Sequence, residues 1–139
     1  MERRDPRADE HDIAAVLLRY ATAIDRRDWD LFRSCFTADV AARYDGLEPW
    51  PDVEAMTAFM IDAHAGMGHT MHRLSNMAID VAGDTATART YVDAILMAPD
   101  GQTGLNPTGF YDDELARTAA GWRITTRTFT SVSFRAVAD

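Results

Sequence analysis

The sequence predicts an α+β fold, because apolar residues follow one period in the first half of the chain and another in the second half. Up to about residue 65 they recur with the helical spacing of about 3.6 residues. From residue 69 the period changes to two, and the β-branched and aromatic residues that strands prefer become frequent. Helices followed by consecutive strands with short turns indicate an antiparallel sheet with the helices on one face. A strongly curved sheet closed by helices encloses a pocket.

Three helices are predicted in the first half of the chain. The first follows a tail, residues 1–8, that we expect to be flexible, and Asp9 or Asp12 is its candidate N-cap. One arc of its helical wheel is apolar and consists of Ile13, Val16, Leu17, Tyr20, Ala21 and Ile24. Asp28 is the predicted N-cap of a short second helix. Pro51 begins the third helix and Gly66 ends it. The apolar stripe of that helix consists of Val53, Met56, Phe59, Met60 and Ala63.

Five strands are predicted, over residues 39–44, 69–81, 85–97, 109–118 and 122–134. Turn residues separate them, as in Asp45-Gly46 and Gly83-Asp84. A longer loop is expected from Pro99 through Pro107. The chain length suits one domain, which we expect to span residues 9–139.

The charge of the chain disfavours several function classes. Its 22 acidic and 14 basic residues give a net charge of −8, which argues against nucleic acid and an anionic membrane surface as partners. All the basic residues are arginine, so Schiff-base lysine catalysis is excluded. The sequence has no apolar run near about 18 residues and no signal peptide, and we expect a cytoplasmic protein.

No metal site and no cofactor are expected. His64, His69 and His72 lie close in sequence without a metal-ligand motif, and we interpret His11 and His64 as surface residues. There is no Walker loop, dinucleotide-binding fingerprint or nucleophile elbow. Cys35 is the only cysteine and lies in a segment typical of a helix interior. We interpret it as a buried structural thiol rather than a nucleophile.

Acid–base chemistry is the class that remains, and it depends on Asp25 and His72. Asp25 lies at the end of the first helix, at the edge of its apolar arc, and Tyr20 lies inside that arc. A carboxylate there reaches a histidine on the sheet, fixes its tautomer and stabilises its charged form. The alternative interpretation is that Asp25 caps the helix and His72 is a hydrogen-bonded core histidine.

Further polar residues lie in otherwise apolar strands, namely Tyr44, Tyr91, Asp93, Tyr111 and Arg127. Each has a structural interpretation, since tyrosines are often half-buried and Asp93 and Arg127 are able to pair with one another. Strict alternation places Arg127 on the opposite face from Trp122 and Ile124, unless a β-bulge intervenes.

Several motifs in order resemble the SnoaL-like branch of the NTF2-like superfamily. The first is Tyr20-x4-Asp25-Arg26-Arg27-Asp28-Trp29-Asp30. His72-x3-Asn76, Gly83-Asp84, Gly109-x-Tyr111 and Gly121-Trp122-Arg123-Ile124 follow it. The resemblance covers about residues 9–134 and implies the family's cone, in which N-terminal helices and a strongly curved antiparallel sheet enclose a pocket. It is less specific for activity, because one fold hosts many chemistries.

The chain is similar to scytalone dehydratase, bile-acid 7α-dehydratase and hexachlorocyclohexane dehydrochlorinase, which use an Asp–His dyad without a cofactor. The resemblance places that dyad at Asp25 and His72. It implies pocket positions at Tyr20, Tyr44, Asp93 and Arg127. An apolar residue near Leu96 replaces the second catalytic histidine of scytalone dehydratase, which speaks against the scytalone reaction itself.

We therefore expect a cofactor-independent dehydratase that acts on a hydrophobic small molecule. His72 is the expected general base, Asp25 orients it, and Tyr20 and Arg127 donate hydrogen bonds to a developing oxyanion. The expected substrate-binding residues are Tyr44, Asp93, Tyr111, Met56, Met60, Met71 and Leu96, and the soft side chains of Met67 and Met97 are also expected to shape the pocket.

Two alternatives stay open. One is an isomerase or polyketide-type cyclase with the same dyad, and the other is a non-catalytic module for binding or assembly. The outer face of a curved sheet usually needs covering, and family members are commonly dimers or trimers. We therefore expect a homodimer or a homotrimer.

Overall fold

The computed structural model describes residues 4–138 and contains three helices and five strands. In chain order these are α1 (Pro6–Arg26), α2 (Trp29–Arg33), β1 (Phe36–Tyr44), α3 (Val53–Ala65), β2 (Thr70–Ala82), β3 (Thr85–Met97), β4 (Gly104–Thr118) and β5 (Gly121–Val137). The α+β class predicted from the change of period is confirmed. No helix within residues 4–138 has the length and apolar character to cross a bilayer.

The strands form one open, curved sheet in the order β1-β5-β4-β3-β2. Strands β2 to β5 are an antiparallel meander, as predicted. The expectation of a wholly antiparallel sheet is wrong for β1, which pairs in parallel with β5. Strand periodicity predicts that β1 exists but not its partner, because that partner lies some eighty residues further along the chain.

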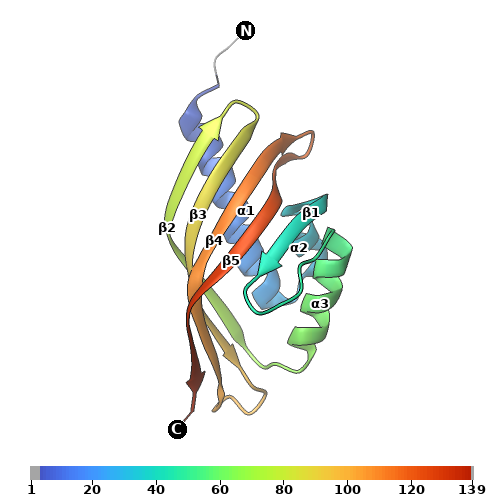
Figure 1. Cartoon of the computed structure of the whole chain (residues 1–139), viewed down its shortest axis with the longest axis vertical. Coiled ribbons are helices and arrows are strands. Elements are labelled where there is room, and N and C mark those ends of the chain that lie inside the picture. Colours follow the sequence, from blue (N-terminus) through green and yellow to red (C-terminus); the bar gives the residue numbers. More distant parts are fainter. Residues whose placement is uncertain (1–3, 139) are drawn as a thin grey trace.

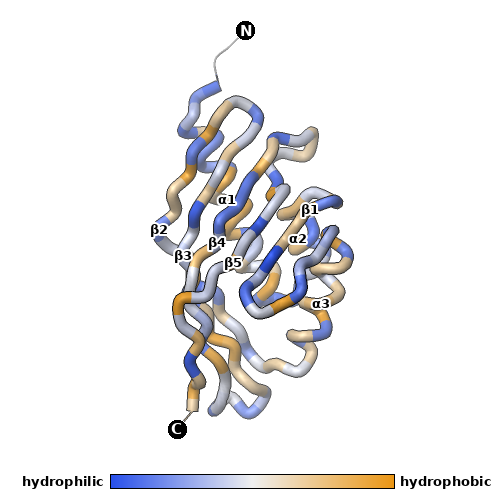
Figure 2. Tube along the Cα trace, in the orientation of Figure 1, coloured by the Kyte–Doolittle hydropathy of each residue, from blue (hydrophilic) through white to orange (hydrophobic). Residues whose placement is uncertain are grey.

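The helices cover one face of this sheet (Figure 1). Helix α1 crosses behind the meander, and α2 and α3 lie beside β1. The predicted apolar arc of α1 is buried, with Ile13, Leu17 and Ile24 at most 1% exposed. Figure 2 shows hydrophobic and hydrophilic residues interspersed along the strands. Burial alternates residue by residue in β3, so one face of that strand packs on the core.

Helix α1 begins earlier than expected. Its N-cap is Asp5, whose side chain accepts from the Arg7 amide, and Pro6 occupies the first helical position. Residues 6–8, expected in a flexible tail, are therefore helical, and residues 1–3 of that tail lie outside the described residues. Asp28 caps α2 as predicted, whereas Asp52 rather than Pro51 starts α3.

The loop expected from Pro99 through Pro107 is shorter than predicted, because β4 begins at Gly104 and includes its last four residues. Proline has no amide hydrogen to donate, and the ladder between β3 and β4 is interrupted at this point. The side chain of Asn106 compensates, since its Nδ2 donates to the Ala94 carbonyl at 2.6 Å and to the Asp93 carboxylate at 2.8 Å. A strand therefore continues where the prolines and glycines of the sequence predict a loop.

A β-bulge in β5 determines which face of the sheet the Arg127 side chain lies on. Leu115 pairs with Ile124 and Glu114 pairs with Thr126, so Thr125 is an extra residue between them. Arg127 consequently shares the inner face with Ile124 and is 2% exposed. A second irregularity, in β2, accompanies Asn76, which has a positive φ of 51°.

Candidate active site

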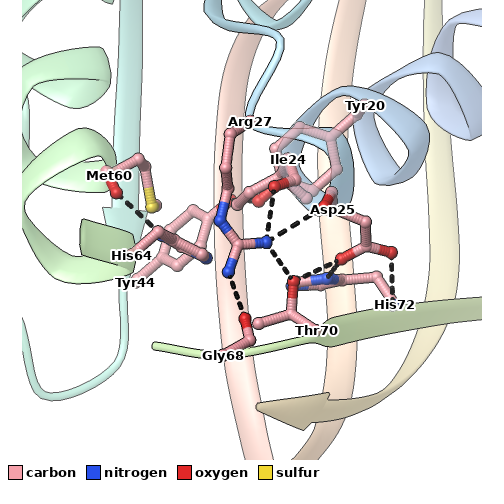
Figure 3. A network of polar contacts seen from close by, with 10 residues as sticks. All are labelled: Tyr20, Ile24, Asp25, Arg27, Tyr44, Met60, His64, Gly68, Thr70 and His72. Carbon is pink, nitrogen blue, oxygen red and sulfur yellow. Dashed lines mark hydrogen bonds and ion pairs between the residues drawn. The ribbon is translucent and has the colours of Figure 1, made fainter. Parts of the chain in front are cut away.

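The carboxylate of Asp25, at the end of α1, accepts three hydrogen bonds from β2 (Figure 3). Its Oδ1 accepts from His72 Nδ1 at 2.7 Å and from Thr70 Oγ1 at 2.9 Å. Its Oδ2 accepts from the backbone amide of His72 at 2.8 Å. Because an ionised carboxylate only accepts, the proton of a neutral His72 lies on Nδ1. The lone pair of Nε2 is then available as a base.

Two opposing effects set the pKa of Asp25. Partial burial raises the pKa, whereas the hydrogen bonds from His72 and Thr70 lower it and outweigh burial. The net pKa is below the ordinary value, so Asp25 is ionised at neutral pH. The side chains are 21% exposed for Asp25 and 8% for His72, so this pair is largely shielded from solvent.

Arg27 connects this end of α1 to the start of β2 through hydrogen bonds. It is the helix C-cap and has a left-handed backbone with a φ of 57°. Its guanidinium donates to Thr70 Oγ1 at 2.8 Å, to the Gly68 carbonyl at 2.7 Å and to the Asp25 carbonyl at 3.0 Å. Arg27 and Thr70 therefore hold the Asp25 carboxylate against His72 (Figure 3).

A cavity of about 430 Å³ lies between the helices and the inner face of the sheet. Its wall is largely apolar and includes six aromatic side chains, Tyr20, Tyr44, Phe59, Tyr111, Phe129 and Phe134. Met60, Met67, Val92, Ala94 and Leu96 add apolar surface, and His64 and Asp45 are the ionisable groups besides the tyrosines. This composition suits a mainly apolar small molecule.

A cluster of tyrosines lines one side of the cavity. The hydroxyls of Tyr20 and Tyr44 lie 2.8 Å apart and share a hydrogen bond. Burial raises the pKa of Tyr20, Tyr44 and Tyr111, so all three stay protonated and able to donate at neutral pH. The cluster places phenolic donors on a wall that is otherwise apolar.

Arg127 lies behind these tyrosines. Its guanidinium carbon is 4.2 Å from the ring centre of Tyr20 and 3.9 Å from that of Tyr111, which places its charge over both rings. It forms two hydrogen bonds of 2.8 Å with Asp113. Burial lowers the pKa of Arg127, but the Asp113 carboxylate outweighs that effect and keeps the arginine charged.

The dyad adjoins the cavity without lining it. The His72 ring packs edge-on against Tyr20, with centroids 6.4 Å apart, and His72 pairs across the sheet with Ala94. Tyr20 and Ala94 both line the cavity. Asp25 and Arg27 line a second pocket together with residues of the turn after β3. Met67 lines both this pocket and the cavity. The dyad therefore lies between the cavity and the second pocket.

The SnoaL-like domain matches residues 5–128, which is most of the chain. The protein belongs to the SnoaL-like family. A relative from Mycobacterium tuberculosis, the uncharacterized protein Rv2910c, is 31% identical over 131 residues, covering 86% of this chain and 83% of its own. The family resemblance inferred from the ordered motifs is therefore confirmed.

Solved structures agree with this assignment of a SnoaL-like fold. A proposed aromatic ring hydroxylase from Novosphingobium aromaticivorans superposes with a TM-score of 0.86 at 30% identity, covering 96% of both chains. A proposed scytalone dehydratase from the same species has a TM-score of 0.85 at 19% identity, covering 94% of this chain and 92% of its own. At that identity the second match supports the fold alone.

In this SnoaL-like domain the predicted site residues fall into three places. Tyr20, Tyr44, Met60, Leu96 and Tyr111 line the cavity. Asp25 and His72 form the dyad at its edge, and Arg127 lies behind the tyrosines rather than in the wall. Met56 is fully buried in the core and is not part of the wall.

Two predicted contacts with substrate are not supported by the structure. Met71 is 48% exposed, and Asp93 lies on the outer side of the sheet, where it pairs with Arg73 at 2.8 Å. Strand alternation explains both, because His72 and Ala94 take the inner positions next to them. Asp93 therefore does not pair with Arg127, whose partner is Asp113.

His64 was interpreted as a surface residue, and this is wrong. It is 7% exposed and lines the cavity of this SnoaL-like domain from α3. The spacing Met56, Met60, His64 was the available signal, since residues four apart lie on one helix face. Cys35 is buried as predicted, but it lies in the turn between α2 and β1 and not inside a helix. Burial raises its thiol pKa to about 11, which disfavours the thiolate that a nucleophile needs.

Proposed function

We propose that this SnoaL-like protein is a cofactor-independent lyase of the dehydratase type that acts on a hydrophobic small molecule. The observation that carries the proposal is the shielded hydrogen bond of 2.7 Å between Asp25 and His72, at the edge of an aromatic cavity. An ionised carboxylate on Nδ1 leaves Nε2 as the base and stabilises the imidazolium that forms on protonation.

The proposed reaction needs only acid–base steps. His72 Nε2 removes a proton from the carbon beside a substrate carbonyl, and the electron pair of the C–H bond forms an enolate. The enolate collapses, and the C–O bond to a hydroxyl on the next carbon breaks. His72 returns its proton to the departing hydroxyl, which leaves as water. The products are an unsaturated carbonyl compound and one water molecule, and the enzyme is regenerated.

The tyrosine cluster is the proposed binding site for the enolate oxygen. Tyr20, Tyr44 and Tyr111 keep their protons at neutral pH and supply donors where negative charge develops. The Arg127 guanidinium behind the rings of Tyr20 and Tyr111 makes their hydroxyls better donors by its positive charge. The reacting carbon must lie at the Tyr20 and Ala94 end of the cavity, where His72 adjoins it.

The test is a product assay with aromatic and alicyclic β-hydroxy ketones, analysed by mass spectrometry. We expect one or more of them to lose a molecule of water faster with the protein than without it. A product of unchanged mass but altered retention would indicate the isomerase or cyclase that shares this dyad. A ligand that is bound tightly and recovered unchanged after long incubation would contradict catalysis and favour a binding module.

A further inference from the structure

His64 lines the cavity and carries an unused hydrogen-bond acceptor. Its Nδ1 lies 2.8 Å from the carbonyl oxygen of Met60, one turn earlier in α3. A carbonyl only accepts, so Nδ1 carries the proton and Nε2 carries a lone pair. Among residues 4–138, this buried Nε2 has no hydrogen-bond partner.

The surroundings of His64 keep it neutral and in place. Burial lowers the pKa of His64 and outweighs the hydrogen bond to the Met60 carbonyl, which raises that pKa, and the charge of Arg27 acts in the same direction as burial. Its ring packs edge-on against Trp29, with centroids 5.9 Å apart. Neither the proposed proton transfer nor the packing of α3 uses Nε2, and buried polar atoms without partners are rare in folded proteins.

We propose that His64 is a ligand-binding residue whose Nε2 accepts a hydrogen bond from a hydroxyl group on an aromatic, phenol-like ligand. The aromatic wall supplies apolar contact for the ring of such a ligand. His64 is an acceptor, whereas the tyrosine cluster supplies donors. The cavity therefore selects a molecule with a hydroxyl donor for His64 and an oxygen acceptor for the tyrosines.

This inference rests on the proposed function only in taking the cavity as the place where the small molecule binds. It deepens that proposal by naming one substrate feature, a hydroxyl directed at α3. A carboxylate in this position is disfavoured, because it has no proton to donate to a neutral Nε2. An ether or a halide of the same shape leaves Nε2 unpaired and loses affinity.

The test compares 2-naphthol with 2-fluoronaphthalene, which has nearly the same shape but no hydroxyl donor. We expect isothermal titration calorimetry to show that the wild-type protein binds 2-naphthol about tenfold more tightly. In His64→Leu this preference is lost, whereas His64→Gln, which keeps an acceptor, recovers part of it. Phe59→Leu, a change in the same wall without a polar atom, alters both affinities by a similar factor and keeps the preference.

Equal affinities of the wild-type protein for both probes, or a preference that survives in folded His64→Leu, would overturn the inference. Thermal unfolding checks that each variant is folded. We expect His64→Leu to stay close to wild type in stability, since it removes an unpaired buried nitrogen together with the Nδ1 hydrogen bond to the Met60 carbonyl. The assay measures binding without turnover, so a failure here is separate from a failure of the dyad, which His72→Ala tests.

Discussion

Asp25 is the residue on which the site depends most, because three donors converge on its carboxylate. Asp25→Ala leaves the His72 amide and ring nitrogen without their acceptor. We expect the free energy of unfolding to fall by about 1–3 kcal/mol, the usual cost of an unpaired buried donor, as measured by urea denaturation. Asp12→Ala, an exposed position on the same helix, is the matched control and should change little. Equal stability of the two variants would contradict this role.

The contribution of Asp25 also depends on pH in a defined direction. Its pKa in the folded protein is lowered, so its stabilising effect is complete above the unfolded value of about 3.9 and is lost as the pH falls through the lower folded value. We expect the stability difference between wild type and Asp25→Ala to be constant near neutral pH and to shrink in acid. A stability difference between wild type and Asp25→Ala that grows as the pH falls would contradict a lowered pKa of Asp25 in the folded protein.

Single residues also show what the sequence predicts about the site and what it does not. The position of Asp25 on its helix and of His72 on its strand left a structural alternative open, and the resemblance to the SnoaL-like family assigned the two residues as a dyad. His64 was missed because its helical face was assigned without it, and burial is decided by how α3 packs beside β1. Met71 was misplaced although alternation puts it on the opposite face from its neighbour His72, and Asp93 was placed in the pocket by the family resemblance and not by its position in the strand.

At the scale of elements, Asp9 joins the start of α1 to the turn between β4 and β5. Its carboxylate receives two hydrogen bonds from Arg117, at 2.8 and 2.9 Å, and one from Trp122 Nε1 at 3.2 Å. The bonds from Arg117 lower the pKa of Asp9 to about 2. Asp9 therefore acts as a tie between layers and not as the N-cap that the sequence suggested.

This tie predicts an acid-sensitive contribution to stability. Asp9→Asn should lower the midpoint of urea unfolding at pH 7, because it removes the charge that Arg117 requires. The contribution is lost between about pH 4, the unfolded pKa, and the folded pKa of about 2. We expect the midpoints of wild type and variant to converge over that window, measured at intervals from pH 5 to pH 2. A gap that persists unchanged at pH 2 would contradict the assignment.

Gly109 lies where the register between β4 and β5 shifts. A Cβ built there would overlap the Thr130 carbonyl oxygen, a backbone atom of the paired strand. Gly109→Ala should cost about 1–3 kcal/mol of stability in urea denaturation, through overpacking and displacement of β5. Gly66→Ala has open space around its Cβ and a φ of −93°, and is the control expected to stay near wild type. Equal effects of the two changes would refute the close approach.

The sequence predicted the type of each helix and strand better than it predicted which strands pair. Periodicity gave every helix and strand type, because each element buries one face. It did not give the parallel pairing of β1 or the strand through Pro107, since both depend on distant backbone partners. The bulge at Thr125 was raised only as a condition for Arg127 to face inward, and the structure meets that condition.

At the scale of the whole molecule, several large apolar side chains are exposed on the surface of the single chain. Val132 is 71% exposed and Phe134 is 62% exposed, and both lie near the end of β5, where Phe134 also forms part of the cavity wall. We propose that a second copy of the chain covers them, in a homodimer or a homotrimer.

Light scattering after size exclusion should give two or three times the mass of one chain. Val132→Asp should shift the population toward monomer, and Ala119→Asp, at the exposed turn after β4, should not. A wild-type protein that is monomeric at high concentration would contradict the proposal.

The catalytic claim concerns the molecule as a unit, because the dyad, the tyrosine cluster and the cavity come from α1, α3 and the sheet together. The most direct test is kcat/KM of His72→Ala on whichever β-hydroxy ketone the wild-type protein dehydrates. Loss of the general base should lower it by about 10²–10⁴-fold, while circular dichroism and the unfolding midpoint show an intact fold. His11→Ala, an exposed histidine on α1, should keep wild-type activity. Undiminished turnover by correctly folded His72→Ala would contradict the account.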